Sequence, residues 1–172
     1  MRIIILRIGH RLYRDKRITT HVGLTARAFG AEGMLLVGSD KSVVNNIQDV
    51  VSRWGGSFWV ANCTDWKQEL KRWKEGGGKV LHLTMYGKNL PDVISRIDAN
   101  KLMVVVGAGK VPSELYDLAD YNVGVTNQPH SEVAALGVLL DWLQIGKELT
   151  KDFGGKMRIV GKFTGKGRMT FE

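Results

Sequence analysis

The sequence has little cysteine, little proline and no long apolar run. Its 172 residues include one cysteine, Cys63, and three prolines. A single cysteine excludes an internal disulfide framework and a cysteine-based zinc cluster. No apolar run reaches the roughly 18 residues that a membrane-spanning helix needs, and the apolar stretch near the N-terminus is too short for a signal peptide. The four histidines lack metal-ligand spacing. We therefore expect a cytoplasmic protein with no membrane segment and no metal.

The composition is that of an ordinary soluble globular protein. Hydrophobic residues make up 44% and charged residues 24% of a chain about one domain long. Twenty-one glycines beside few prolines indicate many tight turns between regular elements. We expect residues 1–150 to form one domain and residues 151–172 to form a basic extension packed on it.

The positive charge is concentrated at the two ends of the chain. The net charge is +8, of which residues 1–17 carry +5 and residues 151–172 carry +4, whereas the middle of the chain carries −1. Basic ends on a nearly neutral body favour a polyanionic partner, although a generally basic surface would give the same total. In residues 156–171, lysine and arginine alternate with Phe163 and Phe171 around Gly165 and Gly167. This pattern predicts a basic hairpin that contacts phosphates.

Short β-rich runs alternate with helical patterns along most of the chain. Several of the β-rich runs are continuously apolar, as in strands that are covered on both faces. This alternation predicts an α/β fold with a mostly parallel sheet and helices on both faces. The predicted strands are 3–8, 34–37, 58–61, 80–84, 102–106 and 122–125, and the predicted helices are 20–29, 42–54, 66–75, 91–97, 112–118 and 131–149. We expect Thr19 or Thr20 to cap the first helix and Asp65 to cap the third.

Two glycine patterns suggest familiar nucleotide sites but do not complete them. Gly107 and Gly109 form a G-x-G, but Pro112 occupies the position of the third small residue. Residues 76–79 read Gly-Gly-Gly-Lys, but they precede a predicted strand and Val80 follows the lysine. The sequence also lacks the G-x-S-x-G elbow of serine hydrolases. Ordinary dinucleotide, phosphate-loop and hydrolase sites are therefore disfavoured.

Three polar loops follow predicted strands in the second half of the chain. They span residues 82–88, 107–112 and 126–132. Ligands of α/β sheets gather at the carboxyl ends of strands, so these loops are candidate ligand contacts. The third loop places the amides of Asn127 and Gln128 directly before a very apolar helix. Clustered amides and helix-start N–H groups suit a polar ligand such as a nucleoside.

Residues 17–31 form a second segment that is hard to explain as scaffold. A loop rich in cations leads into a helix that carries Thr20, His21 and Arg27. We expect His21 and Arg27 to border the crevice at the strand ends. The competing interpretation is that Arg27 pairs with an acid and His21 is an ordinary surface group.

Together these segments resemble the SPOUT class of RNA methyltransferases. The phrases that carry the resemblance are Thr-Thr-His-Val-Gly-Leu-Thr-Ala-Arg-Ala-Phe-Gly, His-Leu-Thr-Met-Tyr-Gly and Asn-Gln-Pro-His-Ser-Glu-Val-Ala-Ala-Leu. Within the class, the chain is most similar to the archaeal branch that methylates the ribose 2′-hydroxyl of the T-loop cytidine at tRNA position 56. The matching segments are residues 11–31, 82–88, 104–112 and 122–141.

The resemblance implies a fold, a cofactor and an assembly. SPOUT enzymes have a deep C-terminal trefoil knot, bind S-adenosylmethionine against the knot loops, and act as homodimers with the active site at the interface. Carried onto this sequence, the cofactor pocket comprises Leu83, Gly107, Ala108, Gly109, Lys110, Val111, Val125, Thr126, Asn127, Gln128, Pro129, His130, Ser131 and Glu132.

The resemblance also implies how the chain would catalyse its reaction. The arginine of the ribose-methylating families corresponds to Arg27, which would orient the 2′-hydroxyl and stabilise the developing alkoxide. Those families usually have asparagine six residues earlier, where this chain has His21, an alternative proton acceptor. Many relatives have an acid where this chain has Gly109. An RNA-binding module without activity, and an enzyme acting on a different RNA nucleotide, are the alternatives.

The predicted partner is tRNA, because a ribose 2′-hydroxyl is present in RNA and absent from DNA. Cations at the two basic ends would bind its phosphates. The predicted RNA-binding residues are Arg11, Arg14, Lys16, Arg17, Lys156, Arg158, Lys162, Lys166 and Arg168.

Overall fold

The main body of the protein is a six-stranded parallel sheet. The structure is a computed structural model that describes residues 1–171; Glu172, one of the C-terminal charges counted above, lies outside the described residues. The strand order is β3-β2-β1-β5-β4-β6, and every adjacent pair is parallel. The strands are β1 (Arg2–Ile8), β2 (Gly33–Val37), β3 (Trp59–Cys63), β4 (Lys79–Asn89), β5 (Lys101–Gly107) and β6 (Tyr121–Gly124).

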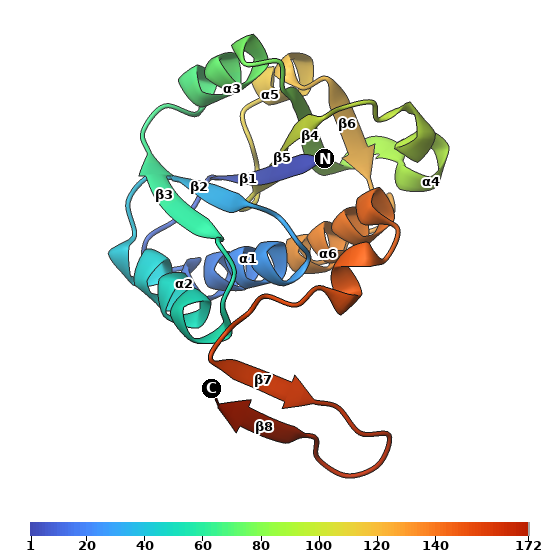
Figure 1. Cartoon of the computed structure of the whole chain (residues 1–172). Coiled ribbons are helices and arrows are strands. Elements are labelled where there is room, and N and C mark those ends of the chain that lie inside the picture. The colour runs from blue at the N-terminus through green and yellow to red at the C-terminus, as the bar shows by residue number, and fades with distance from the viewer. Residues whose placement is uncertain (172) are drawn as a thin grey trace.

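Helices cover both faces of this sheet, as Figure 1 shows. One face carries α1 (Lys16–Ala28), α2 (Lys41–Trp54) and α6 (Glu132–Gln144), and the other carries α3 (Trp66–Glu75) and α5 (Glu114–Leu118). Shorter turns are α4 (Leu90–Val93) and the 3-10 helices Ile94–Arg96 and Lys147–Thr150. The predicted α/β architecture is confirmed. None of the helices within residues 1–171 is both long and apolar enough to cross a membrane.

Alternation along β1 builds two separate cores. Ile3 and Ile5 join the core under α1, α2 and α6, whereas Ile4 and Leu6 join the core under α3 and α5. All four side chains are at most 3% exposed. Arg7 lies on the same face of β1 as Ile3 and Ile5. Its charged side chain therefore points into the layer where α1 and α6 pack on the sheet.

The first helix begins four residues earlier than predicted. Its N-cap is Asp15, not Thr19 or Thr20, and the Asp15 side chain makes no capping hydrogen bond. The Asp15 carboxylate instead accepts hydrogen bonds from Arg11, at 2.7 Å from Nε and 3.0 Å from the main-chain nitrogen. These bonds lower the pKa of Asp15 to about 2. The predicted cap at Asp65 of α3 is confirmed, because its carboxylate accepts from Lys67 N and Gln68 N.

The last long helix ends earlier than predicted. We expected one helix over residues 131–149, but α6 stops at Gln144. Ile145 and Gly146 then adopt left-handed conformations with φ of 58° and 71°. Two consecutive left-handed residues cannot continue a right-handed helix, so the chain turns into the short 3-10 helix.

A buried carboxyl in that 3-10 helix leads to a stability prediction. Glu148 is 4% exposed, and neither of its carboxylate oxygens has a hydrogen-bond partner among the described residues. Burial raises the pKa of Glu148, and so does the neighbouring Asp141. Since the folded-state pKa lies above the unfolded value, the charged carboxylate destabilises the fold at neutral pH. This penalty disappears once the pH falls below the unfolded value.

We therefore expect Glu148→Gln to raise the melting temperature at pH 7 by roughly 2–6 °C. Thermal unfolding followed by circular dichroism measures the difference, which should shrink towards zero near pH 4. The exposed Glu75→Gln serves as the matched control, with an expected change below about 1 °C. A lower melting temperature for Glu148→Gln at pH 7 would contradict the prediction.

The C-terminal segment forms the predicted hairpin. Strands β7 (Met157–Val160) and β8 (Arg168–Phe171) pair in antiparallel fashion. The hairpin projects beyond the layer formed by α1, α2 and α6 (Figure 1). Before it, Gly154 forms an isolated bridge with Gly55 at the end of α2. The trefoil knot stays a prediction.

Candidate cofactor site

A cavity of about 1100 Å³ lies beside residues 82–86 within β4 and at the carboxyl ends of β5 and β6. Its walls come from β4, the loop after β5, helix α5, and the segment between β6 and α6. This is the edge of a parallel sheet at which α/β proteins bind ligands. The lining residues are His82, Leu83, Thr84, Met85, Tyr86, Gly107, Gly109, Lys110, Val111, Pro112, Ser113, Tyr116, Val125, His130, Glu132 and Ala135.

Many of the predicted pocket residues share this cavity. They come from all three segments singled out in the sequence as loops, although these are far apart along the chain. The first segment, residues 82–88, is part of β4 and not a loop. The predicted residues that line the cavity are Leu83, Gly107, Gly109, Lys110, Val111, Val125, His130 and Glu132.

The other predicted pocket residues lie beside the cavity without lining it. Asn127 holds its loop in place, because its Nδ2 donates to the carbonyl oxygens of Met85 and Gly87. The Ser131 side chain caps α6 by accepting from Val133 N at 3.2 Å. Helix capping and loop anchoring explain Asn127 and Ser131 without a ligand. The residues of this second group are Ala108, Thr126, Asn127, Gln128, Pro129 and Ser131.

Sequence reasoning missed several lining side chains, among them His82 and Tyr116. His82 is 1% exposed and its Nδ1 lies 3.0 Å from Asn122 Oδ1. Burial lowers the pKa of His82, against the effect of the Asn122 hydrogen bond, so its imidazole is neutral at pH 7. Its ring meets the ring of Tyr116 edge to face, with the centroids 4.7 Å apart. The available signal was position, because His82 is the first residue of the singled-out segment 82–88.

Two glycines keep the loop after β5 open to a ligand. A Cβ added to Gly107 would lie 2.3 Å from Val111 Cγ1, so a side chain there would have to displace that wall. Gly109 has a φ of +116°, a conformation that residues with a side chain rarely adopt. Main-chain atoms therefore form this part of the cavity surface, whereas residues with larger side chains would fill the cavity.

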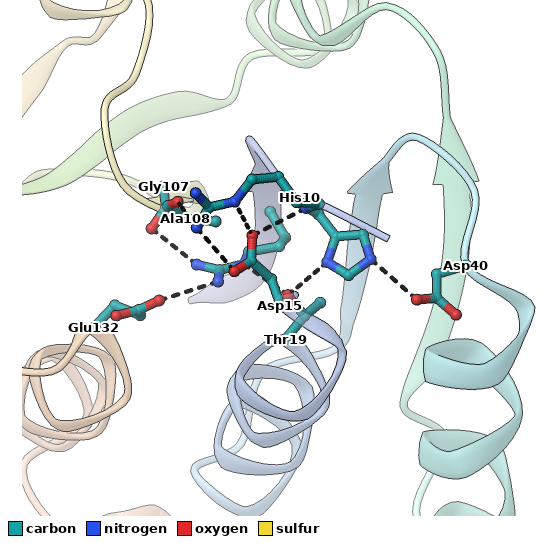
Figure 2. Close-up of polar contacts among 9 residues, drawn as sticks. His10, Asp15, Thr19, Asp40, Gly107, Ala108 and Glu132 are labelled. Carbon is teal, nitrogen blue, oxygen red and sulfur yellow. Dashed lines mark hydrogen bonds and ion pairs between the residues drawn. The ribbon is translucent and has the colours of Figure 1, made fainter. Parts of the chain in front are cut away.

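A buried polar network links this cavity to the start of α1 and α2. Arg7 is fully buried and donates to Thr19 Oγ1, to the carbonyl oxygen of Gly107 and to Glu132 Oε1, at 3.2, 2.9 and 3.1 Å. The Thr19 oxygen also lies 3.0 Å from His10 Nδ1, and His10 Nε2 lies 3.1 Å from Asp40 Oδ2. Figure 2 shows Glu132 at one end of this network and the contacts of His10 with Thr19 and Asp40 at the other.

The donors and acceptors of this network are mutually consistent. Because Thr19 Oγ1 accepts from Arg7, its hydroxyl can donate to His10 Nδ1, which leaves His10 Nε2–H to donate to Asp40. Burial alone would raise the pKa of Asp40, but hydrogen bonds from Val43 N, His10 and Ser42 N outweigh it and lower the pKa. The network therefore fixes the end of β1 against both helices.

Arg27 lies away from the large cavity within one chain. It occupies the last turn of α1, and its Nη2 donates to the carbonyl oxygen of Gly55 at 2.7 Å. Its guanidinium carbon lies 4.7 Å from the ring centroid of Phe153. Arg27 is 7% exposed, burial lowers its pKa, and its Nε lacks a partner among residues 1–171. Arg27 instead lines a separate cavity of about 170 Å³ beside the C-terminal segment.

His21 and Arg27 do not come together at the strand ends. His21 is exposed on α1, at the outer surface of the helix layer. The expected crevice shared by these two side chains is therefore absent from the described part of a single chain.

The predicted RNA-binding cations form two exposed groups. Arg11, Arg14, Lys16 and Arg17 lie between β1 and the first turn of α1, where Arg11 pairs with Asp15 and its Nη2 approaches the Ala108 carbonyl oxygen at 3.5 Å. The first group is thus next to the large cavity. The second group belongs to the C-terminal segment and comprises Lys156, Arg158, Lys162, Lys166 and Arg168.

We expect RNA affinity to fall steeply with salt if these cations contact phosphates. A protein that makes six to ten phosphate contacts loses affinity by on the order of 10³-fold or more between 50 and 200 mM salt. Filter binding of tRNA over that range measures the slope of log K against log salt. The double variant Lys162→Gln/Lys166→Gln should reduce the slope by about 2. A salt-independent affinity would contradict the assignment.

Among residues 1–171, no group of three or more histidine, cysteine, aspartate or glutamate side chains could hold a metal ion. The single thiol, Cys63, is partly buried, and burial raises its pKa to about 11. At pH 7 this thiol is protonated and a poor nucleophile.

Comparison with known proteins identifies close relatives over nearly the whole chain. Residues 54–169 match the family model described as tRNA ribose 2′-O-methyltransferase, aTrm56. A tRNA (cytidine(56)-2′-O)-methyltransferase from Methanothrix thermoacetophila is 58% identical over 167 residues, which is 96% of each chain. A protein of the same name from Methanopyrus kandleri is 55% identical and covers 96% of this chain and 94% of its own.

Solved structures with a similar fold are RNA methyltransferases of low sequence identity. An RNA 2′-O ribose methyltransferase superposes with a TM-score of 0.64 over 85% of this chain, at 16% identity. The SpoU methyltransferase AviRb from Streptomyces viridochromogenes, solved in complex with AdoMet, gives 0.57 over 83% at 15% identity. This chain covers 57% of each of these two longer chains.

Proposed function

This chain belongs to the aTrm56 family of tRNA ribose 2′-O-methyltransferases, and we propose that its large cavity binds S-adenosylmethionine. The chain methylates the ribose 2′-hydroxyl of cytidine 56 in tRNA. The observation that carries this conclusion is 58% identity over 96% of both chains to a tRNA (cytidine(56)-2′-O)-methyltransferase. This similarity confirms the predicted family and the predicted reaction.

The cavity suits the methyl donor by size and by chemistry. Its volume of about 1100 Å³ slightly exceeds that of typical small-molecule pockets. Apolar and aromatic side chains such as Val111 and Tyr116 can pack on a purine, and the glycine walls expose main-chain groups to it. Lys110 offers a positive charge to the donor's carboxylate, and Glu132 is the one acidic side chain among the described lining residues that can face a positively charged group of the donor. A SpoU relative of the same fold is solved with AdoMet, which supports the assignment.

When bound, S-adenosylmethionine would supply the methyl group, and its sulfur would keep the electron pair of the carbon–sulfur bond that breaks. The ribose 2′-oxygen would bond to the methyl carbon and lose its proton. The proposed role of Arg27 is to orient the ribose hydroxyl and to stabilise the negative charge that develops on its oxygen. A guanidinium suits this role because it remains protonated at neutral pH. His21 is the candidate acceptor of the released proton.

This role of Arg27 requires a homodimer. Arg27 does not line the large cavity of its own chain, so we propose that it serves the cavity of a second copy. Helix α6 and the turn after it carry an exposed apolar stripe that could form the contact between copies. The stripe comprises Val138, Trp142, Ile145 and Leu149, which are 40%, 43%, 82% and 65% exposed. Exposed apolar stripes of this kind mark protein–protein interfaces.

The proposed cellular setting is the cytoplasm, where tRNA is modified. The basic groups beside the cavity and on the hairpin would hold the tRNA phosphates, and the 2′-hydroxyl would make RNA the substrate.

The test is methylation of an unmodified tRNA transcript by the full chain with S-adenosylmethionine. Mass spectrometry of nuclease fragments should place one added methyl on the ribose of nucleotide 56. A transcript with 2′-deoxycytidine at position 56 is the matched control and should accept none. Methylation at another nucleotide, or binding of both ligands without transfer, would overturn the proposal.

A further inference from the structure

Glu132 is the one carboxylate among the described residues that line the large cavity. It is the first residue of α6, directly after the capping Ser131. Its side chain is 33% exposed, so the carboxylate reaches the surface of the cavity and is not enclosed in the core. The N-terminus of a helix favours negative charge at this position.

Arg7 supports this carboxylate from behind. The Arg7 side chain is completely buried, and its three hydrogen bonds reach α1, the loop after β5 and Glu132. Moving the guanidinium would break all three contacts, so Arg7 is a fixed support. In Figure 2, the dashed line from the Glu132 carboxylate at the start of α6 marks the hydrogen bond from Arg7.

The geometry leaves part of the Glu132 carboxylate free for a ligand. Only Oε1 is bonded to Arg7, and Oε2 has no hydrogen-bond partner among residues 1–171. An ion pair that served only the core would satisfy both oxygens and exclude solvent. Here the cation is buried and the anion faces the cavity, so a positive ligand group can approach the carboxylate.

We propose that Glu132 distinguishes the positively charged methyl donor from the neutral product. This inference rests on the proposed binding of S-adenosylmethionine in the cavity. The donor carries a positive sulfonium, whereas S-adenosylhomocysteine has an uncharged thioether and is otherwise nearly the same molecule. A fixed carboxylate attracts the first more than the second, and it therefore favours donor binding and product release. Arg7 is the positioning residue for Glu132.

Isothermal titration of the full chain with three ligands tests this role. The ligands are S-adenosylmethionine, S-adenosylhomocysteine and sinefungin, in which a carbon bearing an ammonium group replaces the methylated sulfur. We expect Glu132→Gln to weaken the two cationic ligands about tenfold and the neutral product less than about threefold. Glutamine keeps an oxygen that can accept from Arg7, so the support stays in place.

Two further variants separate charge from shape. Glu132→Asp keeps the charge on a shorter side chain and should retain the preference for the cationic ligands. Glu114→Gln makes the same charge change at an exposed residue of α5 that pairs with Lys67 and does not line the cavity, and it should change each affinity less than about twofold.

The outcomes are distinct. Equal losses for all three ligands in Glu132→Gln would show that the pair only maintains the cavity, and unchanged affinities would show that Glu132 plays no part. Either result overturns the inference while leaving the cofactor site intact. Failure of the wild-type chain to bind any of the three would overturn the proposed cofactor site itself.

Discussion

Replacing Arg27 with alanine is expected to lower the kcat of tRNA methylation by about 10²- to 10³-fold while leaving the affinity for S-adenosylmethionine within about twofold. Losing one electrostatic contact to a developing oxyanion has this magnitude. The affinity for S-adenosylmethionine should change little because the proposed contact of Arg27 is the ribose hydroxyl and not the methyl donor. Single-turnover methylation and isothermal titration measure the two quantities separately.

The control must account for the packing of Arg27. Its guanidinium holds Gly55 and lies over Phe153, so alanine also loosens the C-terminal segment. Phe153→Leu removes the stacking partner and keeps the cation, and we expect it to lower kcat less than about tenfold. If Phe153→Leu and Arg27→Ala cost the same, Arg27 serves the fold and its assigned catalytic role is wrong.

Five of the six strands of the main sheet were predictable from the sequence because burial on both faces leaves a continuous apolar signature, whereas β4 runs on to Asn89 through the segment predicted as a loop. Runs such as 102–106 are typical of strands in the centre of a covered sheet, and β5 differs from the prediction by one residue at each end. Helices α2 and α3 were predictable within a residue for a different reason, because their apolar residues recur with a helical period.

The start of α1 was not predictable, because a long-range competitor takes its capping group. Asp15 is a good cap by residue type, but its carboxylate is used by Arg11, which also approaches the loop after β5. The early end of α6 was also not predictable. Ile145 is an apolar residue that continues the helical pattern, and no neighbouring residue type indicates its left-handed conformation.

Charge counting also misassigned Arg7. Among residues 1–17 it contributes to the basic end, yet it is fully buried and paired with Glu132, 125 residues later in the chain. Local composition cannot distinguish an arginine that faces RNA from one that completes a buried network. The loops that follow strands were predictable as a site because every parallel strand ends at the same edge, whereas the buried support behind them depends on tertiary contacts.

The position of Arg27 leads to the second large prediction, that two inactive variants restore activity when mixed. One is Arg27→Ala, which keeps an intact cavity. The other is Gly107→Val, whose side chain would collide with Val111 and fill the cavity wall, and which keeps Arg27. Each alone should be nearly inactive, and titration should first confirm that the second binds no S-adenosylmethionine.

Mixing equal amounts under subunit exchange should restore about one quarter of the wild-type activity per chain. Random pairing makes about half of the dimers mixed. In each mixed dimer, the intact cavity of the Arg27→Ala chain receives Arg27 from the Gly107→Val chain. The second site lacks both an intact cavity and the arginine. An arginine acting within its own chain leaves every site defective, because no chain then has both groups. Activity that stays at the level of the separate variants, with mixed dimers demonstrated by mass spectrometry, would therefore place the reaction within one chain and refute the shared site.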